Sequence, residues 1–351
     1  MAHRMRPFLL LLTPLALAAQ TAVLENSTVR AVFDLAGGSL IEFQLRDAPL
    51  NPLTWDSRGE PNAPRPRGHF ICFDRWGQPS AAELKNGMPF HGEATRVRWK
   101  LGSAAASTVR MSASLPIAGL AMDRTAQLAG AASLRVTETV TNGNKLGRMY
   151  NLVQHPSIAP PFLDETTVVD SNARKGFMQS SPMPNPEEPP VWWPRALHEG
   201  HAVDLRHLTS DHNPNVVSYV VDEEYGWVTA ASPAKGLLIG YLWRVREYPW
   251  LNIWRNVEKG KPTARGLEFG TTGLHQPFET LVAKSRIFGR PLYQYLDASG
   301  SATRSYAAFL AKIPAGYQGV AKVSYDGARV TLTERGSARV IAIETGALFP
   351  D

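Results

Sequence analysis

The stretch GGSLIEFQLRD, residues 37–47, carries the pattern that decides the fold class. After the two glycines its side chains alternate between apolar and polar, with Ile41, Phe43 and Leu45 set against Glu42, Gln44 and Arg46. A period of two residues is that of a strand with one buried face. Paired glycines favour a tight turn, so the stretch predicts a turn followed by a half-buried β-strand.

The same alternation recurs along the chain. It is present in TVRMSASL, residues 108–115, and on both sides of Asp326-Gly327, which predicts a hairpin. Residues 305–313, SYAAFLAKI, fit a helix or a strand equally well. Amphipathic helices are scarce, and 351 residues can form one large domain. We therefore predict an all-β protein, a large antiparallel β-sandwich.

The first 19 residues predict a signal peptide. A basic start with Arg4 and Arg6 precedes a short apolar run, and Ala16-Leu17-Ala18 resembles a cleavage site. A buried N-terminal helix or an uncleaved anchor are the alternatives. Cleavage would leave residues 20–351 as a single domain, exported to the periplasm or secreted, with no membrane contact.

Charge and cysteine content exclude some classes. The formal net charge of +6 falls by two when the signal peptide is removed, and no basic run is interleaved with aromatic residues. Nucleic acid is therefore not expected as a partner. The single cysteine, Cys72, excludes an internal disulfide, and its strand-like apolar surroundings predict a buried, inert thiol.

Three stretches concentrate side chains that can perform acid–base chemistry. The first is RGHFICFDRWG, residues 67–77, followed by HGEATRVRW, residues 91–99. The second is NLVQHPSIAPPFLDE, residues 151–165, in which His155 precedes a proline. The third joins YPWLNIWRN, residues 248–256, to RGLEFGTT, residues 265–272, where Glu268 lies between Leu267 and Phe269.

In order and spacing, residues 23–288 resemble the aldose 1-epimerase (galactose mutarotase-like) superfamily. Arg67-Gly68 is similar to the family's Arg-Gly-Gly segment, with His69 in place of the second glycine. HGEATR resembles the family's His-Gly-Phe-Ala-Arg motif, although Glu93 and Thr95 depart from it and the arginine comes one position late, at Arg96. NLVQHP and PWLNIW…GLEFG resemble the segments that carry the family's acid histidine and catalytic glutamate.

The resemblance implies a sugar bound in a concave cleft on one sheet and interconversion of its α and β anomers. The base would be Glu268 and the acid His155, on opposite sides of the hemiacetal, with His91 as a second imidazole that polarises the ring oxygen. No cofactor is implied. The ligand would be a monosaccharide or the end of a glycan, bound by a set of arginines and tryptophans: Arg67, Arg96, Trp192, Trp243 and Trp254.

Each candidate also has a structural interpretation. His91 before Gly92 can be a turn residue, His155 can end a strand, and Glu268 can form a salt bridge with Arg265 or Arg255. Arg67 can be a solvated loop residue, and Trp192-Trp193 can anchor a loop. If His91 does contact a ligand, the absence of a side chain at Gly92 would keep space open around the imidazole.

A second group of histidines lies in HEGHAVDLRHLTSDH, residues 198–212. So many imidazoles could in principle bind a metal ion. Their spacing, however, matches no established ligand pattern, and Gly200 disfavours the helix that a His-Glu-x-x-His site needs. We expect a polar surface segment.

Three other functions remain open on the sequence alone. A binding module without chemistry would keep the stacking tryptophan and Arg67. A hydrolase or lyase acting on glycans would need a second carboxylate, supplied by Asp74 or Glu93. A protein acting on hexose 6-phosphates could use Arg67, Arg75 and Arg96 for the phosphate, but the predicted export disfavours it.

Overall fold

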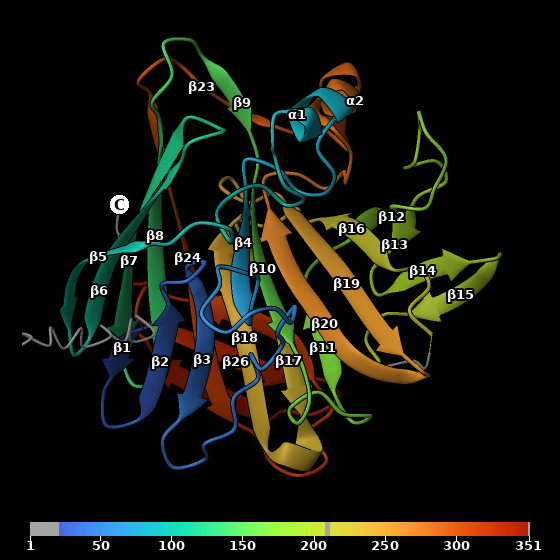
Figure 1. Cartoon of the computed structure of the whole chain (residues 1–351). Coiled ribbons are helices and arrows are strands. Elements are labelled where there is room, and N and C mark those ends of the chain that lie inside the picture. The colour runs from blue at the N-terminus through green and yellow to red at the C-terminus, as the bar shows by residue number, and fades with distance from the viewer. Residues whose placement is uncertain (1–20, 208–210, 350–351) are drawn as a thin grey trace, which may run out of the picture.

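The computed structural model of the chain describes residues 21–207 and 211–349, and its strands form two large sheets (Figure 1). The predicted signal peptide lies outside the described residues. Strand pairs within both sheets are antiparallel. The predicted all-β class and large antiparallel sandwich are confirmed.

One sheet has ten strands. In spatial order they are β1 (Thr21–Glu25), β2 (Val29–Asp34), β3 (Ser39–Leu45), β4 (His69–Phe73), β10 (Leu152–Ile158), β20 (Lys261–Gly270), β19 (Trp250–Glu258), β16 (Val216–Val220), β12 (Lys175–Met178) and β13 (Val191–Trp192). Strands distant in sequence, β4, β10 and β20, thus become neighbours in its middle.

The other sheet has eight strands. In spatial order they are β11 (Val168–Ser171), β17 (Tyr225–Ser232), β18 (Leu237–Arg244), β24 (Ser301–Lys312), β8 (Ser133–Asn142), β7 (Leu120–Ala129), β6 (Thr108–Leu115) and β5 (Lys100–Ala105). The main hydrophobic core lies between the sheets and combines side chains of both, such as Phe43 and Ile71 with Met122 and Val136.

The remaining elements are short. Three further strand pairs are β14 (Arg195–His198) with β15 (His201–Asp204), β21 (Arg286–Ile287) with β22 (Arg290–Pro291), and β9 (Arg148–Tyr150) with β23 (Gln294–Leu296). Within residues 21–207 and 211–349 the helices are α1 (Ala81–Lys85), α2 (Phe278–Lys284) and a 3₁₀ turn (Pro233–Lys235). In the described part of the chain, no helix is long and apolar enough to cross a membrane.

The turn, strand and hairpin predicted from local sequence patterns are confirmed. Gly37 and Gly38 form the turn between β2 and β3 with left-handed φ values of 111° and 70°. TVRMSASL is β6, and Asp326-Gly327 connects two paired strands. The ambiguous residues 305–313 fall mostly within β24, so tertiary pairing with β8 and β18 decides their conformation.

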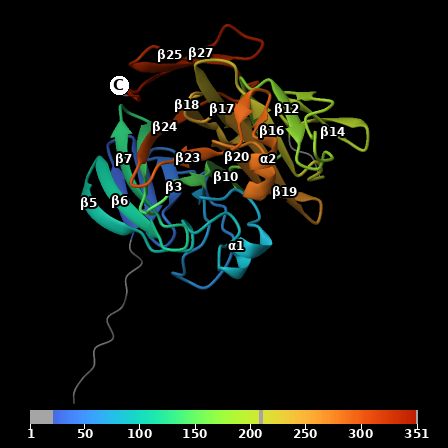
Figure 2. The same ribbon diagram turned by 90° about the horizontal axis from the view of Figure 1, so that it is seen from above.

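A small C-terminal sheet covers the outer side of the eight-stranded sheet. It consists of β25 (Val320–Tyr325), β26 (Arg329–Glu334) and β27 (Val340–Glu344), and Figure 2 shows it beyond β17, β18 and β24. Its Val330 and Leu332 share a second hydrophobic cluster with Leu238, Leu242 and Phe309. Strands β18 and β24 are therefore apolar on both faces.

Candidate active site

A cavity of about 350 Å³ opens on the face of the ten-stranded sheet that points away from the main core. This size lies within the ~300–1,000 Å³ typical of small-molecule sites. Five of the predicted site residues line it: His91, Arg96, His155, Trp254 and Glu268. The other lining residues are Trp55, Ser57, Pro66, Phe70, Trp76, Phe90, Asn215, Val216 and His275.

Strand register brings His155 and Glu268 together in the cavity floor. Gln154 of β10 pairs with Phe269 of β20, so the adjacent residues face each other on the opposite side of the sheet. His155 Nε2 lies 3.1 Å from Glu268 Oε1, and neither side chain is more than 6% exposed. The two groups are neighbours on the sheet, which corrects the expectation that they face each other across a hemiacetal.

Neighbouring side chains fix the orientation of both His155 and Glu268. The Trp76 indole N–H donates to Glu268 Oε2 over 2.8 Å, and His155 Nδ1 lies 2.9 Å from Ser157 Oγ. The Phe70 ring stacks on the His155 imidazole with centroids 4.1 Å apart. The salt bridges from Arg265 or Arg255 that the sequence left open for Glu268 are not formed, because its partners are His155 and Trp76.

His91 is fixed as a hydrogen-bond donor toward the cavity. Its Nδ1 accepts the backbone N–H of Gly77 over 3.0 Å, so the neutral ring carries its proton on Nε2. Burial lowers the pKa of His91 well below its ordinary value, and the neighbouring His155, His275 and Arg96 add to that shift. The residue has a left-handed φ of 66°, a conformation that costs energy for any side chain.

The structure gives a backbone explanation for the glycine at position 92. A Cβ atom at this position would lie 1.9 Å from the backbone oxygen of Phe73, and φ is 77°. The glycine therefore permits the close bridge between this loop and the end of β4. This backbone role is sufficient to explain the glycine, and the idea that Gly92 also keeps space open around His91 stays a prediction.

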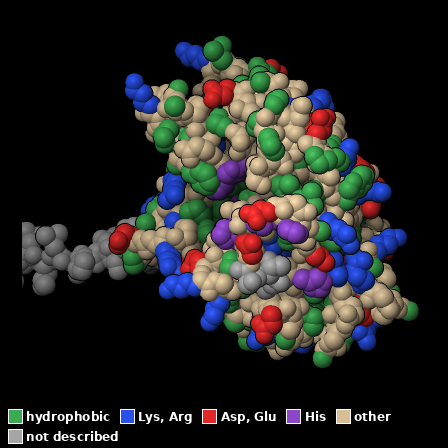
Figure 3. All heavy atoms as spheres, turned by 90° about the vertical axis from the view of Figure 1, so that its right-hand side faces the viewer, with side chains coloured by type: hydrophobic (Ala, Val, Ile, Leu, Met, Phe, Trp, Pro, Cys, Tyr) green, Lys and Arg blue, Asp and Glu red, His purple; other side chains and the backbone are tan. Residues whose placement is uncertain are grey.

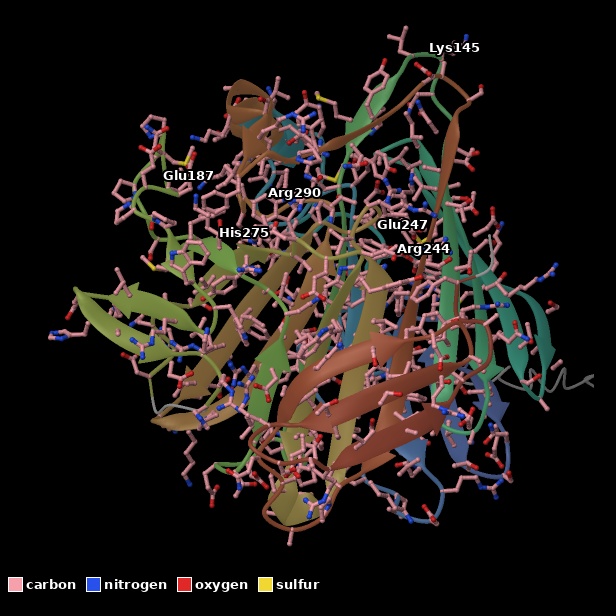
Figure 4. All side chains as sticks on the ribbon, turned by 180° about the vertical axis from the view of Figure 1, so that it is seen from behind. Lys145, Glu187, Arg244, Glu247, His275 and Arg290 are labelled. Atoms are coloured by element: carbon pink, nitrogen blue, oxygen red, sulfur yellow. The ribbon has the colours of Figure 1, made fainter. Side chains whose placement is uncertain are left out.

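His275 is a site residue that sequence reasoning missed. It lies between β20 and α2 (Figure 4), lines the cavity, and its imidazole packs edge-on against Trp76 with centroids 4.7 Å apart. Burial lowers its pKa, so the ring is neutral near pH 7. Gly77 makes room for it, since a Cβ there would come within 2.7 Å of the ring. No motif signals that the chain returns to the cavity after β20.

The cavity walls are aromatic. Trp254 was expected here, whereas Trp55, Phe70, Trp76 and Phe90 were not identified from sequence. The Trp55 ring stacks on Phe70 at 5.5 Å and meets Trp254 edge-on at 5.7 Å. Such surfaces suit the C–H faces of a pyranose.

Two of the three tryptophans predicted to stack on sugar lie elsewhere. Trp243 is fully buried in the main core, stacked on Phe269 at 4.4 Å, so its prediction is corrected. Strand β18 is covered on both faces, so its sequence does not alternate between apolar and polar residues. Without that alternation, the sequence does not show which face of the sheet Trp243 lies on. Trp192 is 55% exposed on the edge strand β13 and does not line the cavity.

The two predicted arginines differ in their surroundings. Arg67 Nη1 lies 2.7 Å from Asp34 Oδ2, and its Nε lies 3.2 Å from Asp56 Oδ2. It supports the wall next to Pro66 and is not itself a lining residue. Arg96 lines the cavity and is exposed.

The additional acidic side chains weighed for a hydrolase are occupied elsewhere. Asp74 is buried against Arg75 and Arg148. Glu93 accepts the backbone N–H groups of Ile117 and Ala118. Among the described residues that line the cavity, Glu268 is the one carboxylate.

Cys72 is buried as predicted, below the cavity floor. It shares a small cluster with Phe70, Trp76 and Val153. Burial raises the pKa of its thiol well above the ordinary value, which keeps the sulfur protonated and unreactive.

None of the histidines of the segment 198–212, His198, His201, His207 and His212, lines the cavity. His198 and His201 belong to the β14–β15 hairpin, and Figure 3 shows histidine side chains gathered on that side of the molecule. His198 Nε2 is 3.9 Å from Asp211 Oδ2 and 4.0 Å from Glu199 Oε1. No group of three or more potential metal ligands is found in residues 21–207 and 211–349.

Comparison with known proteins gives a result at the level of structure. No family model and no curated protein matches the sequence. An Escherichia coli K12 protein provisionally assigned as an aldose 1-epimerase superimposes with a TM-score of 0.62 and 14% identity, over 84% of this chain and 99% of that one. The chain has the galactose mutarotase-like fold.

Two further galactose mutarotase-like structures agree. A galactose mutarotase-like protein from Lactobacillus casei has a TM-score of 0.62 and 18% identity, over 83% of this chain and all of that one. A galactose mutarotase related enzyme from Lactobacillus acidophilus has a TM-score of 0.62 and 12% identity, over 84% of this chain and 98% of that one. At these identities the likeness establishes the fold, and function has to be argued from the cavity itself.

Proposed function

We propose that the protein binds an aldose and interconverts its α and β anomers, with Glu268 and His155 as the proton-transferring groups. The observation that supports this most directly is the imidazole–carboxylate contact of 3.1 Å in the floor of a cavity walled by indole and phenyl rings. The same residue pair was proposed from the family-like segments of the sequence.

The closeness of the pair suits the chemistry of a hemiacetal. Ring opening removes the proton of the anomeric hydroxyl and adds one to the ring oxygen, while the bond between C1 and the ring oxygen breaks. Both oxygens are bonded to C1 and therefore lie close together, so a base and an acid that are neighbours on the sheet can each reach one of them. Glu268 takes the first proton, and protonated His155 supplies the second.

Ring closure reverses these roles. After rotation about the C1–C2 bond, His155 removes the proton from the former ring oxygen as that oxygen attacks C1. Protonated Glu268 then returns its proton to the carbonyl oxygen, which becomes the new anomeric hydroxyl. Both side chains regain their starting states, and no other reactant is consumed.

Neighbouring groups assist this exchange. His91 presents Nε2–H and is neutral, so it acts as a donor to a sugar oxygen and not as a competing base. Trp76 holds the second Glu268 oxygen and so orients the carboxylate. Trp55 and Trp254 provide the apolar surface for the pyranose ring.

The content of the cavity disfavours the two-carboxylate glycosidase. That mechanism needs carboxyl groups about 5–9.5 Å apart across the bond that is cleaved. Glu268 has no such partner among the described lining residues, and Asp74 and Glu93 are engaged in the ion pairs and backbone contacts given above.

The proposal includes export, on the strength of the signal-like residues 1–19. N-terminal sequencing of the protein purified from the culture medium or the periplasm should begin near residue 20. A chain that retains residues 1–19 and remains in the cytoplasm would contradict this part.

Saturation-transfer NMR over a panel of aldoses tests the proposed reaction. The wild type should exchange the anomers of at least one sugar faster than the spontaneous rate. His155→Gln should lower that rate by about 10²-fold or more, whereas His201→Gln, on the β14–β15 hairpin, should leave it unchanged. Calorimetric binding without enhanced exchange for any sugar would instead identify a carbohydrate-binding protein without chemistry.

A further inference from the structure

Two segments that contribute lining residues to the cavity, residues 55–67 and 90–98, are rich in arginine. Apart from Arg96, the arginines of these two segments each have a protein acceptor. Arg58 Nη2 lies 4.0 Å from Glu258 Oε2, Arg65 Nε lies 2.8 Å from Asp56 Oδ1, Arg67 Nη1 lies 2.7 Å from Asp34 Oδ2, and Arg98 Nη2 donates to Asn62 O over 2.7 Å.

Arg96 is the exception, and it is the arginine that lines the cavity. Its backbone N–H bonds to Glu93 O, but its guanidinium has no hydrogen bond or ion pair with any residue in the described ranges. The cavity's carboxylate, Glu268, is already in contact with His155 and Trp76. The charge of Arg96 is therefore not compensated from within the cavity.

We propose that Arg96 anchors the carboxylate of an acidic sugar, so that the preferred substrate is a hexuronate rather than a neutral hexose. This inference rests on the proposed function and narrows its substrate class. A guanidinium offers two parallel N–H donors that match the two oxygens of a carboxylate. One uncompensated cation also matches one negative charge, whereas a phosphate dianion would call for more than one.

The place of the anchor is consistent with the chemistry of the ring. A hexuronate carries its carboxylate on C5, which is bonded to the same ring oxygen as C1. The anchor must therefore lie beside the groups that act on that oxygen. Arg96 follows His91 by five residues on one wall segment, and the His91 ring centroid is 5.9 Å from that of His155.

The test compares matched sugars and matched variants. Affinity is measured by calorimetry and anomer exchange by NMR for D-glucuronate against D-glucose and D-galacturonate against D-galactose, with glucose 6-phosphate as a further probe. The proteins are the wild type, Arg96→Gln, Arg96→Lys and Arg98→Gln. Arg98 is the control because it lies two residues away and donates to Asn62 O instead of lining the cavity.

The wild type should bind one hexuronate roughly 10- to 100-fold more tightly than its neutral counterpart, the range expected of a charge-assisted hydrogen bond. Arg96→Gln should abolish that preference and leave neutral hexose affinity within about threefold, while Arg96→Lys should retain part of it. Arg98→Gln should behave as wild type. Raising the salt concentration should weaken hexuronate binding alone.

Several results would overturn the inference: equal affinity for hexuronate and hexose in the wild type, no hexuronate binding at all, equal losses for both sugars in Arg96→Gln, or tighter binding of the phosphate. Affinity and exchange are separate readouts. Hexuronate binding that depends on Arg96 but is not accompanied by exchange would refute the proposed reaction and leave the anchor established.

Discussion

Polar side chains on the two faces of the ten-stranded sheet differ in how they are satisfied: those on the core face bond to other protein groups, and those on the cavity face include groups left open to a ligand. On the core face, His69 and Gln154 form a buried hydrogen-bonded chain with Glu138 of β8 in the facing sheet, and the chain ends at Arg124 of β7. On the cavity face, one residue along the same strands, Phe70 and His155 line a cavity in which Arg96 has no acceptor among the described residues.

This difference separates stability from function. Glu138 accepts Arg124 Nε over 2.7 Å and Gln154 Nε2 over 2.6 Å, and its side chain is fully buried. A charge in such a network is needed to satisfy its partners. Glu268 is equally buried but faces an imidazole that a sugar can reach. Both carboxylates are inaccessible to bulk water, so burial alone does not distinguish the structural one from the functional one.

The largest expected effect on stability comes from the core face. Glu138→Gln leaves the buried Arg124 without its counter-charge and should lower the free energy of unfolding by about 3–5 kcal/mol. Urea denaturation followed by tryptophan fluorescence measures this. If Glu138→Gln is as stable as the wild type, the sealed network is not the structural element described here.

A smaller but still large loss is expected where the cavity loop meets β4. Gly92→Ala places a methyl group against Phe73 O and adds the left-handed penalty of about 1–2 kcal/mol. Gly336→Ala is the control, since its φ is 70° and nothing lies within 4 Å of the added Cβ. Gly92→Ala should therefore lower the melting temperature clearly more than Gly336→Ala, and equal losses would contradict the close-approach explanation.

Gly77→Ala should act on the cavity more than on the fold. The added methyl displaces the His275 ring and disturbs the bond from Gly77 N to His91. Gly87→Ala is matched to it, because its φ of 87° is similar to the 97° of Gly77 but its Cβ would meet only Ile117 Cδ1, at 3.6 Å. We expect about a tenfold or greater loss of anomer exchange in Gly77→Ala, an effect of misplaced groups, and none in Gly87→Ala.

Acid should weaken both faces through their histidines. Burial lowers the pKa of His69, His91 and His275 in the folded protein, while the unfolded chain takes up these protons near pH 6.5. Below pH 6.5 the unfolded state then binds more protons, so the free energy of unfolding falls as the pH falls, by up to about 1.4 kcal/mol per pH unit for each histidine.

Urea denaturation at pH 7.5, 6.5 and 5.5 measures that slope. The contribution of these histidines to the free energy of unfolding should hardly change above pH 6.5 and should fall with pH below it. His275→Gln should remove the contribution of one histidine to that pH dependence. A protein whose stability is constant or rises between pH 6.5 and 5.5 would contradict the neutral state assigned to these rings.

The part of the site that lies on strands could be predicted from sequence. His155, Trp254 and Glu268 lie in short segments that resemble those of a known family, and strand pairing brings them onto one face. The fold class could also be predicted, since the period of two in β3 and β6 is visible without any distant contact.

Most of the part that lies on loops could not be predicted; the exceptions are His91 and Arg96, whose segment was identified by its resemblance to the His-Gly-Phe-Ala-Arg motif. Trp55, Trp76, Phe90 and His275 reach the cavity because their loops fold over the sheet face, and nothing in their immediate sequence encodes that return. The prediction that Trp243 stacks on a sugar was wrong for a different reason. Its strand is apolar on both faces because the C-terminal sheet covers the outer one, so periodicity holds no information about direction.

The most direct test of the account is the anomer exchange rate of Glu268→Gln, measured by saturation-transfer NMR together with its free energy of unfolding. The account predicts that exchange falls to the spontaneous rate, while stability changes by no more than about 1 kcal/mol, because glutamine can still accept the Trp76 N–H. Exchange that persists in a folded Glu268→Gln protein would show that the cavity carboxylate is not the base, and would contradict the central claim.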